Sequence, residues 1–545
     1  MKITRVHIIK AATCGGLLDG LDVGLRGPPS GPEQFDPLCL VGPNGAGKSQ
    51  FLQVIAEAFQ TVFHACVQDE ERAKGNEDLQ FEIEYVIRPA RSREPVLVRL
   101  SRCGNGKRRP ALKIECKDGI NWVDFPAEHP ATRELLPSRV IGYTSGDNET
   151  LSLPFLVSRS GYADAVGKQA LAREPSATQK PIPDTRLMLV DYGTHLEVLV
   201  ANLLLGPEEE RIALLRDARL KDLHSFRCVI QLAHRAVPKL SAHKTSLKRR
   251  KGVQLTEELE RYIDQLKRCS TCHSFEEKSE TYVFDFLVTD ETREAFRCFW
   301  QTSLELYSAL HKLSMLNDLA IPKVSRERLL RDIKTRRFAS RLPEPQDEDR
   351  VFRFEQVRFL PKAGDGVVDY VSLSDGEHQL AQILGTMCMA SFPNALFLLD
   401  EPESHFNPQW RVKFISRLLD LPTANGRRAD ALAAANQQDC LLTTHSPFVP
   451  SDMSREKVLI FKKTAQGVEV RRPNIETFGT TFDTILEECF DIRPPMSEVP
   501  KREIEELMKS HDRNALRAGI ARLGDSVEKV FLMDRLRQLS KQEGV

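Results

Sequence analysis

The sequence predicts an α/β protein with a mixed core sheet, an antiparallel β subdomain, a large helical insertion and a helical C-terminal tail. Largely apolar runs at residues 38–41, 395–400 and 440–445 are typical of buried parallel strands. Runs of alternating polarity between residues 79 and 116, separated by Pro and Gly clusters, indicate antiparallel strands. Apolar residues at helical spacing dominate two later regions, which we expect to form the insertion and the tail.

The first elements in chain order are two short strands, residues 3–9 and 21–25, followed by a turn-rich stretch. The apolar run 38–41 then leads into the segment GPNGAGKS at residues 42–49. After it, apolar side chains recur at helical spacing, which predicts an amphipathic helix beginning near Gln50. A strand, a glycine-rich loop and a helix in this order are the context of a phosphate-binding loop.

Residues 42–49, which we call the phosphate loop, match the motif at every fixed position. In this motif successive backbone N–H groups close around a β-phosphate, a lysine reaches the β and γ oxygens, and a hydroxyl binds Mg²⁺. The loop therefore predicts ATP and Mg²⁺ as ligands. The residues assigned to the nucleotide are Asn44, Gly45, Gly47, Lys48 and Ser49, with Ser49 also assigned to the metal.

Composition limits the class of protein. The chain has 545 residues, 28% charged and 41% hydrophobic, which is ordinary for a soluble globular protein of several compact units or one domain with an insertion. The 77 basic and 77 acidic residues cancel, so no global charge attracts nucleic acid. No stretch has the length of a membrane span, and we expect a cytoplasmic protein that does not contact the membrane.

The 12 cysteines form no disulfide framework, and several lie in apolar runs where a reduced thiol packs. Cys269 and Cys272 have the spacing of half a zinc site. Zinc would need two further ligands from a symmetry mate or from distant residues such as Cys298, and ordinary packing is the favoured interpretation.

Local basic clusters are the candidate contacts to nucleic acid. One is the tip of a predicted hairpin, Arg102 with residues 107–109, and two lie in the insertion, residues 244–251 and 323–341. Basic clusters can bind phosphates or simply face solvent, and the sequence leaves both interpretations open.

Linker-like stretches at residues 174–183 and 342–349 delimit the insertion. Four units are therefore expected: an N-terminal ATPase lobe, a helical insertion, a C-terminal ATPase lobe and a helical tail. Their boundaries are 1–173, 189–342, 343–480 and 481–545.

The C-terminal lobe holds the second half of the nucleotide machinery. The segment LSDGE at residues 373–377 opens a helix, so Ser374 and Gly376 can grip a γ-phosphate at its N-terminus. The strand at residues 395–400 ends in Asp400, assigned to Mg²⁺, and Glu401 follows as the residue that polarises the attacking water. The strand at residues 440–445 ends in His445, assigned to the γ-phosphate.

The order of these motifs resembles the ABC-type ATPase superfamily, in which the signature serine of one subunit completes the ATP site of another. The resemblance implies an ABC-ATPase head and a homodimer or higher homo-oligomer formed through the heads. This sequence departs from the superfamily in two places. Asp375 replaces a glycine, and the sensing turn after residue 140 has no glutamine, which leaves Ser145, Asp147 and Asn148 as candidates for the metal or water contact.

The segment LDEPESHFNPQW at residues 399–410, together with residues 140–155 and the segment TTHSP at 443–447, resembles ATPases of bacterial anti-phage defence. The resemblance is to the ATPases of Septu systems (PtuA), including retron-associated forms. It implies a separate HNH nuclease partner (PtuB-like), and nucleic acid or retron RNA–DNA as further candidates. Consistent with a separate nuclease, the residues after His445 contain no acidic DxD cluster.

Two other functions stay open at this stage: a DNA-repair clamp of the RecF or SMC kind, in which the insertion holds DNA, and a scaffold that binds ATP without hydrolysing it. The tail helices carry more apolar surface than a solvent-facing end needs. That surface either folds back on the ATPase lobes or docks another chain, and we expect docking.

Overall fold

The computed structural model of the chain describes residues 1–542 apart from several segments. The exceptions are residues 28–33, 91, 93, 105–109, 146–148, 171–179, 192–193, 234–252, 254, 323, 326, 329–330, 333–344, 424–425 and 431–433. The basic cluster at residues 244–251, most of the cluster at 323–341, and the hairpin tip at 107–109 therefore lie outside the described residues, and their role in nucleic-acid binding stays a prediction.

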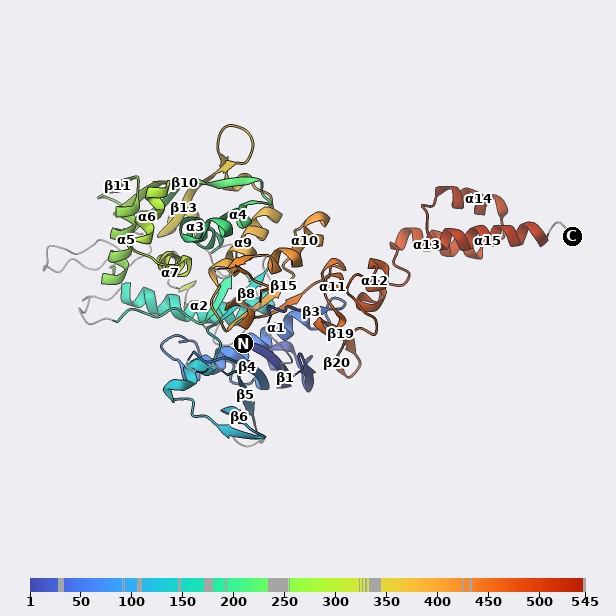
Figure 1. The fold of residues 1–545 in the computed structure, drawn as a ribbon, viewed down its shortest axis with the longest axis horizontal. Helices are drawn as coiled ribbons and strands as arrows, with labels where there is room; N and C mark the ends of the chain where they lie inside the picture. Colours follow the sequence, from blue (N-terminus) through green and yellow to red (C-terminus); the bar gives the residue numbers. More distant parts are fainter. Residues whose placement is uncertain are drawn as a thin grey trace.

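A seven-stranded mixed sheet forms the centre of the molecule, with the order β20-β19-β3-β18-β15-β8-β9 (Figure 1). All neighbours pair in parallel except β20, which returns antiparallel to β19. The parallel carboxyl ends therefore meet at one edge of the sheet. The strand bounds are β3 Leu38–Val41, β8 Arg139–Thr144, β9 Leu187–Val190, β15 Ala395–Asp400, β18 Asp439–Thr443, β19 Val458–Thr464 and β20 Gly467–Arg471.

The apolar runs form these strands because both faces of the sheet are covered. Along β3, Leu38 and Leu40 enter one hydrophobic core while Cys39 and Val41 enter the other. Helix α1 (Lys48–Cys66) covers the first face and packs against α2 (Glu149–Ala170). On the second face lie α3 (His195–Leu205), α9 (Asp375–Met389) and α10 (Pro408–Leu419).

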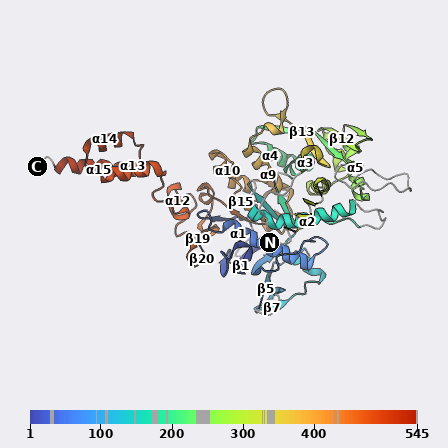
Figure 2. The ribbon, with the colours of Figure 1, turned by 180° about the vertical axis from the view of Figure 1, so that it is seen from behind.

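The predicted antiparallel subdomain is present as a six-stranded sheet with the order β2-β1-β4-β5-β6-β7 (Figure 2). Its strands are β1 Lys2–Lys10, β2 Leu21–Gly24, β4 Gln80–Ile87, β5 Val96–Cys103, β6 Ala111–Asp118 and β7 Asn121–Asp124. Arg102, assigned to the basic hairpin tip, is instead buried. Its guanidinium donates to the backbone carbonyls of Asn76 at 2.6 Å and Glu77 at 2.8 Å, so it stabilises the subdomain.

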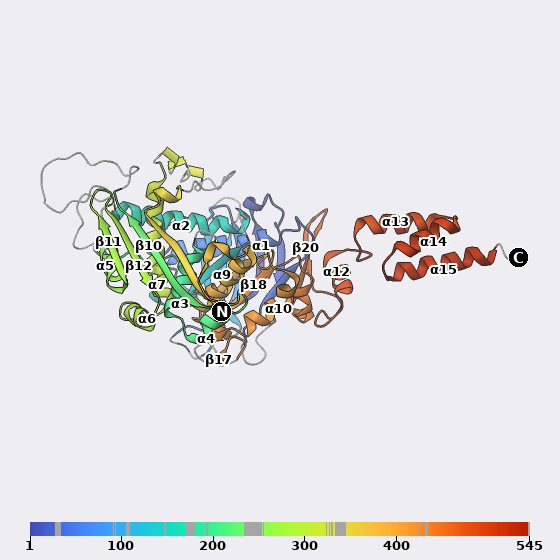
Figure 3. The same cartoon turned by 90° about the horizontal axis from the view of Figure 1, so that it is seen from above.

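The insertion contains the expected helices and also strands that the sequence did not predict. Besides α3, which covers the core sheet, its described helices include α4 Glu208–Leu215, α5 Glu257–Cys269, α6 Asp290–Arg297 and α7 Ser303–Ser314. A five-stranded antiparallel sheet, with the order β11-β12-β10-β13-β14, lies beside them (Figure 3). Its strands are β10 Leu220–Gln231, β11 Cys272–Glu276, β12 Thr281–Leu287, β13 Phe352–Pro361 and β14 Val368–Asp369, and the last two belong to the chain after the insertion.

The sequence did not predict strand β10, because its pairing with β13 is irregular at three places. These irregularities displace buried residues from strict alternation, so Leu220, Leu223 and Phe226 are buried at intervals of three. Spacing of this kind indicates a helix when the sequence is read alone.

The C-terminal helices extend away from the rest of the molecule, and the chain ends at their far tip (Figures 1 and 3). Helix α12 (Phe482–Phe490) contacts the ATPase lobe through α11 (Phe448–Ser451). Helices α13 (Glu498–Lys509), α14 (Arg513–Arg522) and α15 (Val527–Gln542) then pack on one another. Within the described part of the chain, no helix is sufficiently long and apolar to cross a membrane.

Candidate nucleotide site

The phosphate loop connects β3 to α1 at the carboxyl edge of the core sheet. Gly42, Gly45 and Gly47 have φ values of 133°, 74° and 90°, a region that residues with a side chain rarely adopt. A Cβ at Gly42 would lie 2.2 Å from the backbone oxygen of Phe461 on β19, so this glycine also permits the close approach of the two strands. The loop thus has the folded-back backbone that exposes N–H groups to an anion.

Lys48 and Ser49 are the first residues of α1. The Lys48 side chain is buried and its Nζ donates to the backbone oxygens of Gly42 at 2.9 Å and Pro43 at 3.2 Å. Burial lowers the pKa of Lys48 to about 8, an effect that the nearby carboxylates of Glu401 and Asp400 oppose. The ammonium group therefore lies over the loop with no carboxylate ion-paired to it among the described residues.

Asp400 and Ser49, the two residues predicted to hold the metal, lie together, and Thr443 joins them. Asp400 ends β15, and its Oδ1 accepts hydrogen bonds from Ser49 at 2.8 Å and from Thr443 at 2.6 Å. Burial raises the pKa of Asp400, while these two hydrogen bonds act in the opposite direction. A carboxylate and a hydroxyl this close together are oxygen ligands of the type that Mg²⁺ prefers, so the residues fit the metal.

Glu401 and His445 face each other across the same edge. His445 Nε2 lies 3.3 Å from Glu401 Oε1, and this hydrogen bond lowers the pKa of the Glu401 carboxyl. Glu401 has a φ of 48°. This left-handed backbone conformation is unfavourable by about 1 kcal/mol for a residue that has a side chain. Its backbone N–H donates to Thr443 Oγ1 at 3.0 Å, which helps to hold the turn.

The signature residues lie at the N-terminus of α9. Ser374 is exposed, and both its N–H and its hydroxyl donate to Glu377 Oε2, each at 2.8 Å. Gly376 is buried, and a Cβ there would lie 2.9 Å from the backbone oxygen of His405. Both hydrogen-bond donors of Ser374 are thus engaged by their own helix rather than by the phosphate loop of the same chain.

The sensing turn is only partly described. The Ser145 N–H lies 3.4 Å from the backbone oxygen of Asp400, because β8 pairs with β15 up to Thr144. The other two candidates, Asp147 and Asn148, lie outside the described residues.

Sequence reasoning gave no role to four residues that make contacts at this edge of the sheet: Thr443, Thr444, Glu403 and Gln379. The Thr443 hydroxyl donates a hydrogen bond to Asp400, and the Thr444 hydroxyl donates one to Glu403. Gln379 of α9 donates to Ser404 Oγ at 3.3 Å and accepts from the His405 N–H at 3.1 Å. The sequence did offer a signal for them, since they are polar residues at the ends of buried strands or on a buried helix face. A polar group in such a position needs a hydrogen-bond partner.

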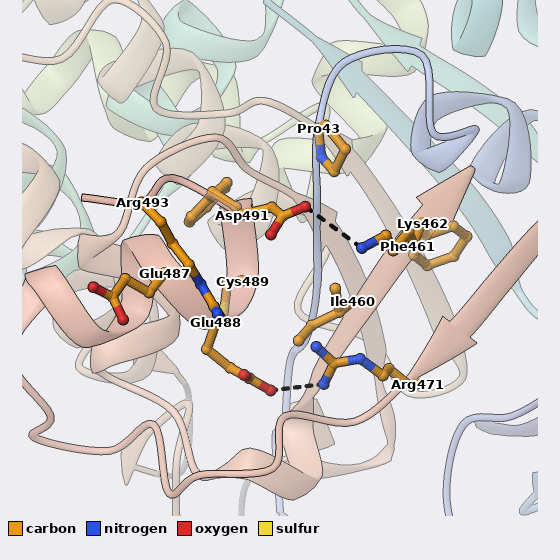
Figure 4. A pocket seen from close by; sticks show the side chains of 11 residues that line it. Pro43, Ile460, Phe461, Lys462, Arg471, Glu487, Glu488, Cys489, Asp491 and Arg493 are labelled. Carbon is orange, nitrogen blue, oxygen red and sulfur yellow. Dashed lines mark hydrogen bonds and ion pairs between the residues drawn. The ribbon is translucent and has the colours of Figure 1, made fainter. Parts of the chain in front are cut away.

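A cavity of about 290 Å³ lies beside the phosphate loop, between the β19–β20 hairpin and the end of α12 (Figure 4). Pro43 lines it from the loop, and two ion pairs cross it, Lys462 to Asp491 at 3.4 Å and Arg471 to Glu488 at 2.6 Å. Since neither Lys48 nor Asp400 lines it, this cavity belongs to the joint between the core and the tail rather than to the nucleotide site.

For Cys269 and Cys272, ordinary packing is the favoured interpretation and zinc is the alternative, with Cys298, which is exposed, as the distant candidate ligand. Cys269 is buried in the main core, whereas Cys272 is exposed on β11. No group of three or more His, Cys, Asp or Glu side chains that could hold a metal ion occurs among the described residues.

P-loop proteins hold a nucleotide and its metal with a glycine-rich loop at the end of one parallel strand. Here an acid and its hydroxyl partner lie on the ends of adjacent strands. The fold and the site are accordingly those expected of a P-loop ATPase.

Comparisons with known proteins show what the chain resembles. Residues 309–452, which hold the signature, Asp400, Glu401 and His445, match a family described as "AAA domain, putative AbiEii toxin, Type IV TA system". Protein ea59 of Escherichia phage lambda is 23% identical over 172 residues, which are 31% of this chain and 31% of that protein. Among solved structures, an SMC head domain from Thermotoga maritima aligns with 87% of this chain and 100% of its own length, at 9% identity and a TM-score of 0.32.

Proposed function

We propose that the chain binds and hydrolyses ATP as a subunit of an anti-phage defence complex, in which ATP-dependent pairing of two heads regulates a separate HNH-type nuclease. The hydrolytic part is supported by one observation above all. Ser49 and Asp400 lie 2.8 Å apart, and the Glu401–His445 pair lies beside them on the same sheet edge.

Each of these residues has a defined task in hydrolysis. Lys48 supplies positive charge to the β- and γ-phosphates, and Ser49 and Asp400 hold Mg²⁺, which when bound neutralises phosphate charge. Glu401 is ionised at neutral pH, because its pKa is lowered, and accepts a hydrogen bond from the attacking water. His445 orients that carboxylate and contacts the γ-phosphate.

Pairing of heads is supported by the exposed signature. The Ser374 N–H and hydroxyl are at a helix N-terminus, where an anion is favoured, and both are engaged only by the side chain of Glu377. The γ-phosphate held by a second copy would compete with that carboxylate for the same two donors. Two ATP molecules would then join two heads.

The defence role and the nuclease partner rest on the resemblance to Septu ATPases. The family description that names a putative toxin, and a relative from a phage, fit a role in conflicts between phages and their hosts. Copurification with an HNH protein would support this assignment. Salt-sensitive, ATP-dependent binding to DNA ends by the ATPase alone would instead support the RecF- or SMC-like clamp.

The decisive experiment compares three variants. Glu401→Gln should bind ATP, hydrolyse it at least about a hundredfold more slowly and accumulate as an ATP-bound dimer, because only the water-orienting carboxylate is lost. Adding Ser374→Arg to that variant should return it to the monomer. Lys48→Ala should not bind ATP. Multi-angle light scattering and ATPase assays measure these outcomes, and equal hydrolysis by wild type and Glu401→Gln would refute the assignment.

A further inference from the structure

A second glutamate, Glu403, lies two residues beyond Glu401 in a very different environment. Its side chain is 3% exposed, whereas the Glu401 side chain is 41% exposed. Around Glu403 lie Cys39 of β3 and the strand end at Thr444. Burying a carboxyl group is unfavourable by several kcal/mol unless hydrogen bonds compensate. No salt bridge to Glu403 is present among the described residues, and burial raises its pKa, although the charge of Arg411 and a backbone N–H act to lower it. The side-chain hydrogen bond to Glu403 comes from the hydroxyl of Thr444.

That hydrogen bond controls the turn that carries His445. Glu403 Oε1 accepts from the hydroxyl of Thr444, and the same hydroxyl accepts from the Ser446 N–H at 2.9 Å. The Thr444 N–H donates to the backbone oxygen of Leu40 on β3 at 3.2 Å. The hydroxyl group of Thr444 therefore connects the two residues that flank His445, Thr444 and Ser446. Glu403 sets the orientation of this hydroxyl group.

We propose that Glu403 is a positioning residue for ATP hydrolysis, which acts through Thr444 to hold His445 against Glu401. This inference rests on the proposed ATPase function and adds a residue to it. Without the carboxyl group, the Thr444 hydroxyl loses its acceptor and can rotate away from the Ser446 N–H. His445 would then leave the position 3.3 Å from Glu401, and the carboxylate that orients water would lose its support.

The role requires a hydrogen-bond acceptor but not a charge. Burial raises the pKa of Glu403 to about 7, and its Oε2 is buried with no hydrogen-bond partner among the described residues. An amide oxygen can accept from Thr444 equally well. Glu403→Gln should therefore keep activity, whereas Glu401→Gln stops turnover, although the two substitutions are chemically identical and two positions apart.

The test measures kcat and the dissociation constant of a fluorescent ATP analogue in the full chain. Glu403→Gln should keep kcat within about twofold of wild type, while Glu403→Ala should lower it at least about tenfold with ATP affinity changed less than about twofold. Thr444→Val should lower kcat like Glu403→Ala, and Thr444→Ser should restore it, because valine matches threonine in shape but cannot donate. The Glu403→Ala/Thr444→Val double variant should be no slower than either single variant, as expected for two residues that act as a unit.

Three results would overturn the role: unchanged kcat in Glu403→Ala, unchanged kcat in Thr444→Val, or an inactive Glu403→Gln that still binds ATP. If Glu403→Ala fails to fold, Thr444→Val and Thr444→Ser, which leave Glu403 in place, provide the test. A wild-type chain that binds ATP without hydrolysing it would refute the proposed function itself. Hydrolysis by wild type with normal turnover in the variants would refute only the role of Glu403.

Discussion

Three carboxyl groups within four positions, Asp400, Glu401 and Glu403, have different chemistry because the strand end places them in different surroundings. Asp400 is buried but accepts from two hydroxyl groups. Glu401 is half-exposed and its pKa is lowered by His445. Glu403 is buried with one hydroxyl donor, and its pKa is raised to about 7. The first two could be assigned from the sequence because they follow an apolar strand, whereas the third depends on contacts with distant strands.

At the same scale, Lys48 makes ATP binding sensitive to pH. Burial lowers its pKa to about 8 in the free protein, and bound phosphates raise the pKa because they favour the charged amine. Binding is therefore strongest below pH 8 and should weaken by up to about tenfold per pH unit above it, since each binding event must then take up a proton. Titration of ATP affinity from pH 7 to 9.5 measures this.

Lys48→Arg provides the control for that titration. A guanidinium stays charged throughout the range, so any remaining affinity of this variant should not fall between pH 8 and 9.5. A wild-type affinity that is flat over the same range would show that Lys48 is already charged in the free protein.

At the scale of elements, the signature helix α9 is joined to the catalytic turn. Gln379 forms hydrogen bonds with Ser404 and His405, and Gly376 lies against the backbone of His405. A shift of α9 on engagement of Ser374 would thus reach the turn that begins at Glu401. This contact connects the part of the head that we propose meets a second copy to the part that we propose performs hydrolysis.

Gly376→Ala tests this contact. The added methyl carbon would lie 2.9 Å from the backbone oxygen of His405 and 3.4 Å from the Trp410 ring, so α9 and the turn must separate. We expect a loss of about 1–3 kcal/mol in the free energy of unfolding and reduced turnover. Gly24→Ala on β2, with nothing within 4 Å of the new Cβ, is the matched control. Urea denaturation of both variants measures the difference, and equal stability would show that the helix can shift freely.

The elements that carry the motifs could be predicted because short apolar runs and regular helical spacing indicate burial on both sheet faces. The sheet of the insertion could not, since the irregular β10–β13 pairing gives buried residues a helical interval. In the site, the phosphate loop and Asp400 follow from local pattern. The Thr443, Gln379 and Glu403 contacts do not, because each joins residues more than 20 positions apart.

At the scale of the whole molecule, the tail is separate from the ATPase body. Helices α13, α14 and α15 form a small core of their own from Ile504, Leu516, Ile520 and Leu532. The predicted apolar surface is thus partly internal to the tail. Part of it stays exposed on α15, notably Val527, Val530 and Phe531.

Removal of residues 496–545 should therefore leave a folded ATPase. In the part of the chain that the structure describes, α13 to α15 pack mainly on one another, and α12 keeps its contacts with α11. We expect kcat, ATP affinity and the melting temperature of the body to be unchanged, and retention of a partner nuclease to be lost, because an exposed apolar helix side is a docking surface for another chain. ATPase assays, calorimetry and copurification measure these three outcomes. Loss of ATP binding on truncation would show that the tail supports the ATPase core, and a truncated chain that still retains the nuclease would move the docking surface to the insertion.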